Sequence, residues 1–114
     1  MPTLRLLTNV EIAAEDHPLV MAELSQRLAE LLGKPESYVM LILEPGRNLL
    51  FAGTAAPAAY LELKSLGLAE TQTSELSRRL CEWLEARLAI PANRVYIEFA
   101  NPPRQMFGWN KGTF

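Results

Sequence analysis

Residues 24–43, LSQRLAELLGKPESYVMLIL, decide the fold together with residues 80–99, LCEWLEARLAIPANRVYIEF, which lie 56 positions further along the chain. Each stretch has leucines at helical spacing, then a proline, then an apolar run. The positions that recur at this separation are Leu24, Leu28, Leu32, Pro35 and Val39, matched by Leu80, Leu84, Leu88, Pro91 and Val95. The pattern favours a duplicated β-α-β unit, although five matches without a shared polar residue also fit coincidence in a leucine-rich chain.

The leucine spacing predicts two amphipathic helices. The first starts after Asp16, which resembles an N-cap, carries Pro18 in its first turn and ends at Gly33. The second begins near residues 71–74 and runs to Leu88. The apolar positions that form the buried stripe of each helix are Val20, Leu24, Leu28 and Leu31 in the first, and Leu76, Leu80, Leu84 and Leu88 in the second.

Four apolar runs predict strands, over residues 3–8, 38–43, 59–66 and 95–99. The resulting order β-α-β-β-α-β predicts an α+β fold, a four-stranded sheet with both helices on one face, since parallel crossovers are right-handed. The other sheet face is then uncovered. We expect it to carry Met40 and Ile42 beside Glu62 and Lys64, a mixed surface that predicts an oligomer.

Composition narrows the classes of function. With 114 residues, 49% of them hydrophobic, the chain predicts a single domain over residues 1–114. A formal charge of −2 leaves no basic patch for nucleic acid or an anionic membrane. There is neither a membrane-crossing run nor a secretory signal, so we expect a cytoplasmic protein, with non-classical secretion left open. One cysteine, Cys81, and one histidine, His17, predict no disulfide, no metal and no other cofactor.

The chain starts Met1-Pro2 and runs directly into the first strand. If Met1 is removed, Pro2 becomes a secondary amine that a strand could hold inside a pocket. Burial and a nearby cation would lower the pKa of this amine towards neutrality, where general bases work best. Taken alone, Met-Pro is explained equally by a residue that merely permits methionine removal.

Several stretches together resemble one family. They are Pro2 ahead of a strand, Gly33-Lys34-Pro35 with Tyr38, Ser65-Leu66-Gly67, Asn93-Arg94-Val95-Tyr96-Ile97, and Phe107-Gly108-Trp109-Asn110 with Thr113-Phe114. In this order they resemble the macrophage migration inhibitory factor and D-dopachrome tautomerase family of the tautomerase superfamily, over essentially the whole chain. The resemblance implies a homotrimer around a central channel, with three pockets at the subunit interfaces.

The resemblance also implies a function: keto-enol tautomerase activity, an isomerase reaction, on phenylpyruvate-like or dopachrome-like small carbonyl compounds. Pro2 would be the general base. Lys34 would attract a substrate carboxylate, although the residue alone is equally an ordinary solvated lysine at a helix end. Tyr96 would donate a hydrogen bond to a carbonyl oxygen of a substrate held at a neighbouring subunit's Pro2. The residues implied as pocket walls are Tyr38, Leu66, Phe107 and Trp109, each equally explained as a core or interface residue.

Two features depart from the family pattern. Glu98 replaces the usual asparagine, and a carboxylate near Pro2 would raise its pKa and repel an anionic substrate. Ala100 replaces a tyrosine common at the pocket rim, which predicts a more open mouth.

The sequence gives less support to two other functions of the family, thiol oxidoreductase activity and cytokine-like receptor binding. Residues 58–61, AAYL, contain no Cys-x-x-Cys, so thiol oxidoreductase activity is not expected, and Cys81 reads as a structural cysteine. Ile12 and Gly46 stand where the cytokine carries charged loop residues, so the sequence does not support receptor binding. A cytokine-like or binding protein with a vestigial pocket stays as the alternative.

Overall fold

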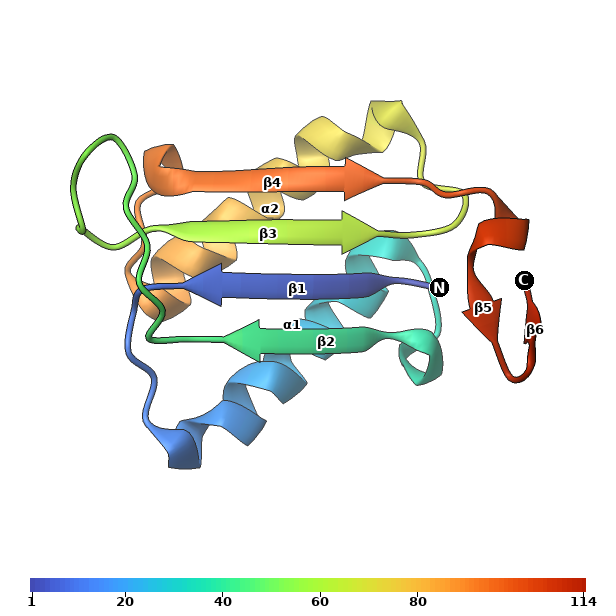
Figure 1. Cartoon of the computed structure of the whole chain (residues 1–114), viewed down its shortest axis with the longest axis horizontal. Helices are drawn as coiled ribbons and strands as arrows, with labels where there is room; N and C mark the ends of the chain where they lie inside the picture. The colour runs from blue at the N-terminus through green and yellow to red at the C-terminus, as the bar shows by residue number, and fades with distance from the viewer.

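The computed structural model describes residues 1–114 and shows a four-stranded sheet with two helices on one of its faces (Figure 1). The main elements are β1 Thr3–Thr8, α1 His17–Leu32, β2 Met40–Glu44, β3 Ala59–Lys64, α2 Glu70–Leu88 and β4 Val95–Ala100. A small hairpin of β5, Gly108–Trp109, and β6, Gly112–Thr113, follows them. Short 3-10 turns lie at Ala14–Asp16, Glu36–Tyr38, Ala92–Arg94 and Arg104–Met106.

The sheet has the strand order β2-β1-β3-β4. β1 is parallel to β2, β3 is parallel to β4, and the central pair β1 and β3 is antiparallel. Each parallel pair is joined through one helix, so the sheet consists of two β-α-β units side by side. This confirms the predicted α+β class, the element order and the placing of both helices on one face.

The apolar residues of the strands and of both helices pack together in one hydrophobic core. The helix-facing residues of the two central strands are buried, and so are most residues of the predicted helical stripes, whereas Leu31, Leu88 and the edge-strand residues are partly buried. The largest fully buried side chains are Leu4, Leu6, Leu24, Leu28, Leu61, Leu63, Leu80, Leu84 and Ile90. Because each buried leucine contributes about 1.5–3 kcal/mol relative to exposure, this layer is the main source of stability.

Helix α1 has nearly the predicted limits. Asp16 occupies the N-cap position, but its side chain makes no capping hydrogen bond, because a 3-10 turn already leads the backbone into the helix. Pro18 lies in the first turn, as predicted. The helix ends at Gly33, whose φ of 63° is left-handed, a conformation in which glycine carries no Cβ penalty.

Helix α2 starts at Glu70, one residue before the predicted range. The side-chain oxygen of Gln72 accepts a hydrogen bond from the Ala69 N–H at 2.9 Å, and this satisfies a donor at the helix start. Alanine is not a recognisable capping residue, so the sequence did not reveal this start. The helix ends at Ala89, which adopts the same left-handed conformation with a φ of 56°.

The strand predicted over residues 38–43 begins later, at Met40, and ends at Glu44. Tyr38 belongs instead to a 3-10 turn, in which its N–H donates to the Pro35 carbonyl at 3.1 Å. The turn removes Tyr38 from the sheet and leaves its ring 41% exposed at the sheet end.

The strand predicted over residues 59–66 is also shorter than expected and ends at Lys64. Ser65 lies in the turn that follows, where its carbonyl accepts a hydrogen bond from the Leu68 N–H at 3.2 Å. The last strand runs one residue beyond its predicted end, to Ala100.

The opposite sheet face is uncovered in the chain and is seen from the front in Figure 1. Met40 is 61% and Ile42 39% exposed, as the sequence predicted. Arg5 lies at the centre of this face and holds Glu44 through two hydrogen bonds, of 2.7 and 3.2 Å, and Glu62 through one of 3.3 Å. The Arg5 hydrogen bond holds the pKa of Glu44 below its ordinary value. The face is therefore a mixture of apolar side chains and paired charges.

Candidate active site

Pro2 is held firmly at the start of β1. Its side chain is fully buried, and its carbonyl accepts a hydrogen bond from the Met40 N–H at 2.9 Å. Met40 opens the neighbouring strand, so the amino terminus is tied to the sheet rather than free in solvent. This is the anchored terminus that an amine base requires.

A cavity of about 220 Å³ lies beside this terminus. Met1 contributes to its wall, and three of the predicted pocket residues line it: Tyr38, Phe107 and Trp109. Phe114, the last residue of the chain, completes the aromatic lining. Such a mostly apolar cavity beside a polar amine suits a small aromatic ligand.

The C-terminal hairpin positions the aromatic wall. Asn110 and Lys111 both have positive φ, 49° and 68°, as in the tight turns that connect two-residue hairpins. The hairpin lies next to the amino terminus (Figure 1). Its Trp109 ring stacks on Phe114 at 5.2 Å with an interplanar angle of 13°, and meets Tyr38 edge-on at 5.9 Å.

Two cations act on the terminal amine. Lys34 directly follows the C-cap of α1, and its Nζ donates to the Leu66 carbonyl at 3.2 Å, which brings these two predicted site residues together. Burial, followed by the charges of Lys34 and Arg104, lowers the pKa of the Met1 amine below its ordinary value. An amine at this end of the sheet is therefore biased towards its neutral, basic form.

Tyr96 and Glu98 do not join this pocket within one chain. Both lie on β4, which β3 separates from β1. Tyr96 pairs in register with Tyr60, and Tyr60 pairs with Leu7, which lies at the end of β1 away from Pro2. The Tyr96 ring packs against Phe51 with 4.9 Å between the ring centroids. The side chain of Tyr96 is exposed, so contact with Pro2 requires a second copy of the chain.

Glu98 has a partner on its own sheet. Its Oε2 accepts a hydrogen bond from the Tyr60 hydroxyl at 3.1 Å. Burial and this hydrogen bond raise the pKa of Tyr60. The hydrogen bond orients the Glu98 carboxylate on the uncovered sheet face.

Sequence reasoning missed several residues of the site. Ser37 and Met40 line the cavity and could have been found from their closeness to Tyr38. Phe114 was noted only as part of a motif. Arg104 lies in a short turn after two prolines, and no sequence pattern marks it as a neighbour of the terminus.

Three further observations concern metal binding, the reactivity of the single thiol and membrane insertion. No three side chains of the types histidine, cysteine, aspartate and glutamate gather as a metal site would require. Burial raises the pKa of the Cys81 thiol, which disfavours the reactive thiolate. None of the helices is long and apolar enough to cross a membrane.

The structure thus combines two β-α-β units, a single helical layer and a buried Pro2 at the head of β1, near an aromatic cavity. A family profile described as Macrophage migration inhibitory factor (MIF) matches residues 1–114. The chain belongs to the macrophage migration inhibitory factor family.

Relatives match over the full length. The macrophage migration inhibitory factor of Xenopus tropicalis is 34% identical over 116 residues, covering 100% of this chain and 99% of the relative. That of Rattus norvegicus is 36% identical over 115 residues with the same coverage.

Solved structures agree in fold. A homologue from Prochlorococcus marinus superposes with a TM-score of 0.89 at 42% identity, covering 98% of both chains. The macrophage migration inhibitory factor of Trichinella spiralis gives a TM-score of 0.91 at 33% identity, covering 98% of this chain and 99% of the other.

Proposed function

We propose that the chain, after loss of Met1, is a keto-enol tautomerase for phenylpyruvate-like or dopachrome-like carbonyl compounds, with Pro2 as its general base. The observation that carries the proposal is the anchored terminus: Pro2 is buried at the head of β1, beside an aromatic cavity and near Lys34. The surroundings that lower the pKa of the Met1 amine would act in the same direction on a free Pro2 amine.

The proposed reaction moves one proton. The neutral Pro2 nitrogen accepts a proton from the carbon next to the substrate carbonyl, and the C–H electron pair forms the carbon–carbon double bond of the enolate. The protonated amine then returns the proton to the enolate oxygen, which gives the enol. No oxidant or cofactor enters this balance, and the reverse sequence converts enol to keto form.

Lys34 and the aromatic walls orient the substrate in this proposal. The Lys34 ammonium attracts the carboxylate of a phenylpyruvate-like compound. Neither Lys34 nor Leu66 lines the cavity, but the hydrogen bond of 3.2 Å between them holds the ammonium group where its charge acts on the terminal amine. Tyr38, Phe107 and Trp109 offer flat surfaces to the aryl ring. A cavity of about 220 Å³ accommodates one such ring rather than a long chain.

We propose further that the active form is a homotrimer. The uncovered sheet face, with Met40 and Ile42 exposed, supports an interface between copies. Tyr96 lies too far along the sheet to reach Pro2 of its own chain, so its proposed hydrogen bond to the substrate carbonyl comes from a neighbour. Light scattering should return roughly three times the chain mass of 12.8 kDa, and a monomer at micromolar concentration would contradict this arrangement.

The remaining proposals concern location. One free cysteine, Cys81, is typical of a reducing compartment, and we place the reaction in the cytoplasm.

The direct experiment is turnover of phenylpyruvate by protein whose terminus has been verified by mass spectrometry. Wild-type chain starting at Pro2 should interconvert the keto and enol forms. Pro2→Ala should keep the oligomer and lose about 10²–10⁴-fold in rate, the share attributed to a positioned acid or base. An alanine inserted before Pro2 should have the same effect. An unchanged rate in Pro2→Ala would remove Pro2 from the mechanism.

A further inference from the structure

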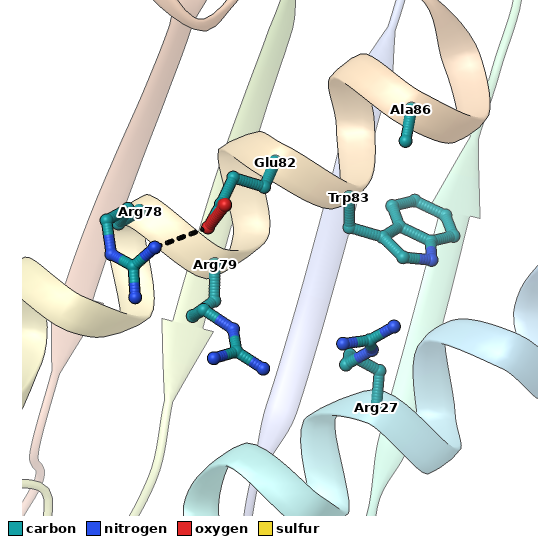
Figure 2. A pocket seen from close by; sticks show the side chains of 6 residues that line it. All are labelled: Arg27, Arg78, Arg79, Glu82, Trp83 and Ala86. Atoms are coloured by element: carbon teal, nitrogen blue, oxygen red, sulfur yellow. Dashed lines mark hydrogen bonds and ion pairs between the residues drawn. The ribbon is translucent and has the colours of Figure 1, made fainter.

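A second hollow lies between the two helices, on the layer that covers the sheet. It has a volume of about 280 Å³. Its walls are formed by Arg27 of α1 and by Arg78, Arg79, Glu82, Trp83 and Ala86 of α2 (Figure 2). We call it the arginine groove. It shares no residue with the cavity at the amino terminus and faces away from the uncovered sheet face.

The three arginines of the arginine groove differ in their partners. Arg78 is fully engaged, with Glu82 at 2.8 Å and with both carboxylate oxygens of Glu75. Arg79 reaches Glu75 at 3.9 Å, and Arg27 takes part in none of the ion pairs of the chain. Two guanidinium groups on opposite helices therefore keep most of their donors free.

Figure 2 shows how the side chains lie. Arg27 rises from α1 and Arg79 descends from α2 into the space between the helices, while the Trp83 indole extends beside Arg27. Trp83 is only partly buried, with part of its ring packed on the core and part left open to the arginine groove. The hollow thus combines two cations with one flat apolar surface.

The arginine groove is rich in positively charged side chains, whereas the chain as a whole has a negative net charge. The protein carries a formal charge of −2, yet Arg27 and Arg79 both line this hollow, where Glu82 is held by Arg78 and Glu75 reaches Arg79 only at 3.9 Å. Like charges that converge in a hollow repel one another unless an anion is shared between them. The guanidinium fork matches phosphate and carboxylate oxygens in a bidentate manner.

We propose that the arginine groove binds a small aromatic phosphate monoester. The phosphate lies between Arg27 and Arg79, and the ring lies on the Trp83 indole. A phosphate monoester carries a charge of about −1.5 to −2 at neutral pH, which matches the unpaired Arg27 together with the weakly paired Arg79 better than a single carboxylate does. The volume, just under the about 300–1,000 Å³ of pockets for drug-sized ligands, suits one ring and one phosphate.

The probe for this site is phenyl phosphate, followed through the fluorescence of Trp83. The chain has two tryptophans, so in Trp109→Phe the tryptophan fluorescence comes from Trp83 alone. Ligand binding in the cavity at the terminus then has no tryptophan there to report it. Phenyl phosphate should give a saturable change. Inorganic phosphate lacks the ring, phenol lacks the phosphate and benzoate lacks the second charge, so each should bind at least about tenfold more weakly.

Arginine variants locate the bound anion. Arg27→Ala and Arg79→Ala should each weaken phenyl phosphate at least about tenfold, since each removes a charge-assisted hydrogen bond to the phosphate. Arg87→Ala is the matched control, because Arg87 lies on α2 outside the groove and pairs with Glu23 at 2.7 Å. Lys34→Met controls for binding at the terminal pocket, and both controls should leave the dissociation constant unchanged.

Three results would overturn the proposal. The first is the lack of a saturable change up to millimolar phenyl phosphate. The second is equal binding of phenyl phosphate in the Arg27 and Arg79 variants. The third is inorganic phosphate binding as tightly as phenyl phosphate, which would remove Trp83 from recognition. None of these readouts depends on tautomerase activity.

Discussion

The two β-α-β units of the sheet make the same turn after their helices but use it differently. In the first unit Gly33 takes the left-handed conformation and is followed by Lys34. In the second, 56 residues later, Ala89 takes it and is followed by Ile90. Each turn then leads through a proline and a 3-10 turn into a strand. The two units therefore share the backbone conformation of this turn but differ in the residue that follows the C-cap, which is Lys34 in the first and Ile90 in the second.

This difference places a partly exposed charged residue in one unit where the other has a buried core residue. Ile90 is fully buried and belongs to the hydrophobic core. Lys34 is only partly buried and sends its ammonium group towards Leu66, at the end of the sheet that carries Pro2. The comparison shows that two turns of the same geometry can carry different side chains: the turn in the second unit contributes to packing, and the turn in the first leaves Lys34 available for the chemistry proposed above.

The largest expected effect in this comparison is at Ile90. Ile90→Ala should lower the free energy of unfolding by about 2–5 kcal/mol, because it removes a fully buried aliphatic side chain and leaves a cavity. Lys34→Met, at the matching position, should change it by less than about 1 kcal/mol. Urea unfolding of both variants measures the difference, and equal losses would contradict the separation of roles.

Lys34→Met should instead change catalysis. We expect kcat/KM for phenylpyruvate to fall about tenfold to a hundredfold, because a charged partner for the substrate carboxylate is lost. The Lys34 charge lowers the pKa of the terminal amine, so its removal should raise the pKa of Pro2. Activity that depends on neutral Pro2 then appears at higher pH, and the acid limb of the pH profile moves upward. An unmoved limb would show that Lys34 does not act on Pro2.

Glu98→Asn should give a smaller change of opposite sign. If the Glu98 carboxylate faces a neighbouring Pro2, its removal lowers the pKa of Pro2, so the acid limb moves to lower pH and kcat/KM for phenylpyruvate rises. We expect a gain of less than about tenfold, because Tyr60 already holds this carboxylate at 3.1 Å. The pH profile of the variant decides the matter. An identical profile would mean that the carboxylate stays with Tyr60, away from the site.

The smallest effects concern the two caps. Gly33→Ala should destabilise the chain by about 1 kcal/mol, because its φ of 63° lies in the left-handed region. An added Cβ would meet no other atom within 4 Å, so the loss comes from backbone strain and not from a steric clash. Ala89→Gly should stabilise it by about 0.5 kcal/mol, because the relieved strain at a φ of 56° exceeds the added freedom of the unfolded chain. Thermal unfolding of both variants should therefore shift in opposite directions. Shifts of the same sign would refute the shared geometry.

The sequence predicted the fold well because leucine spacing records which helix face is buried. Both helices, the four strands of the main sheet and its uncovered face were predicted from such patterns, but the small hairpin of β5 and β6 was not. The boundaries at Met40 and Lys64 were not, since local turns rather than hydrophobicity end the pairing there. The start of α2 depends on the Gln72 side chain beside an alanine, which no capping pattern reveals.

The site was predicted in part. Tyr38, Phe107 and Trp109 lie together in the cavity beside the terminus, whereas Leu66 does not line it, and the role of these residues in substrate binding stays a prediction. Arg104 could not be predicted, because its closeness to the terminus follows from the path of a short loop. The arginine groove was equally hidden, since its facing arginines come from two helices whose spacing only the packed sheet sets.

The most direct test of the central claim uses two fractions of the same protein, one retaining Met1 and one starting at Pro2, separated and identified by mass spectrometry. In the first fraction the Pro2 nitrogen is an amide without a basic lone pair, so it cannot take a proton from carbon. The account predicts turnover of phenylpyruvate only by the fraction that starts at Pro2. Full activity in the fraction that keeps Met1 would contradict it.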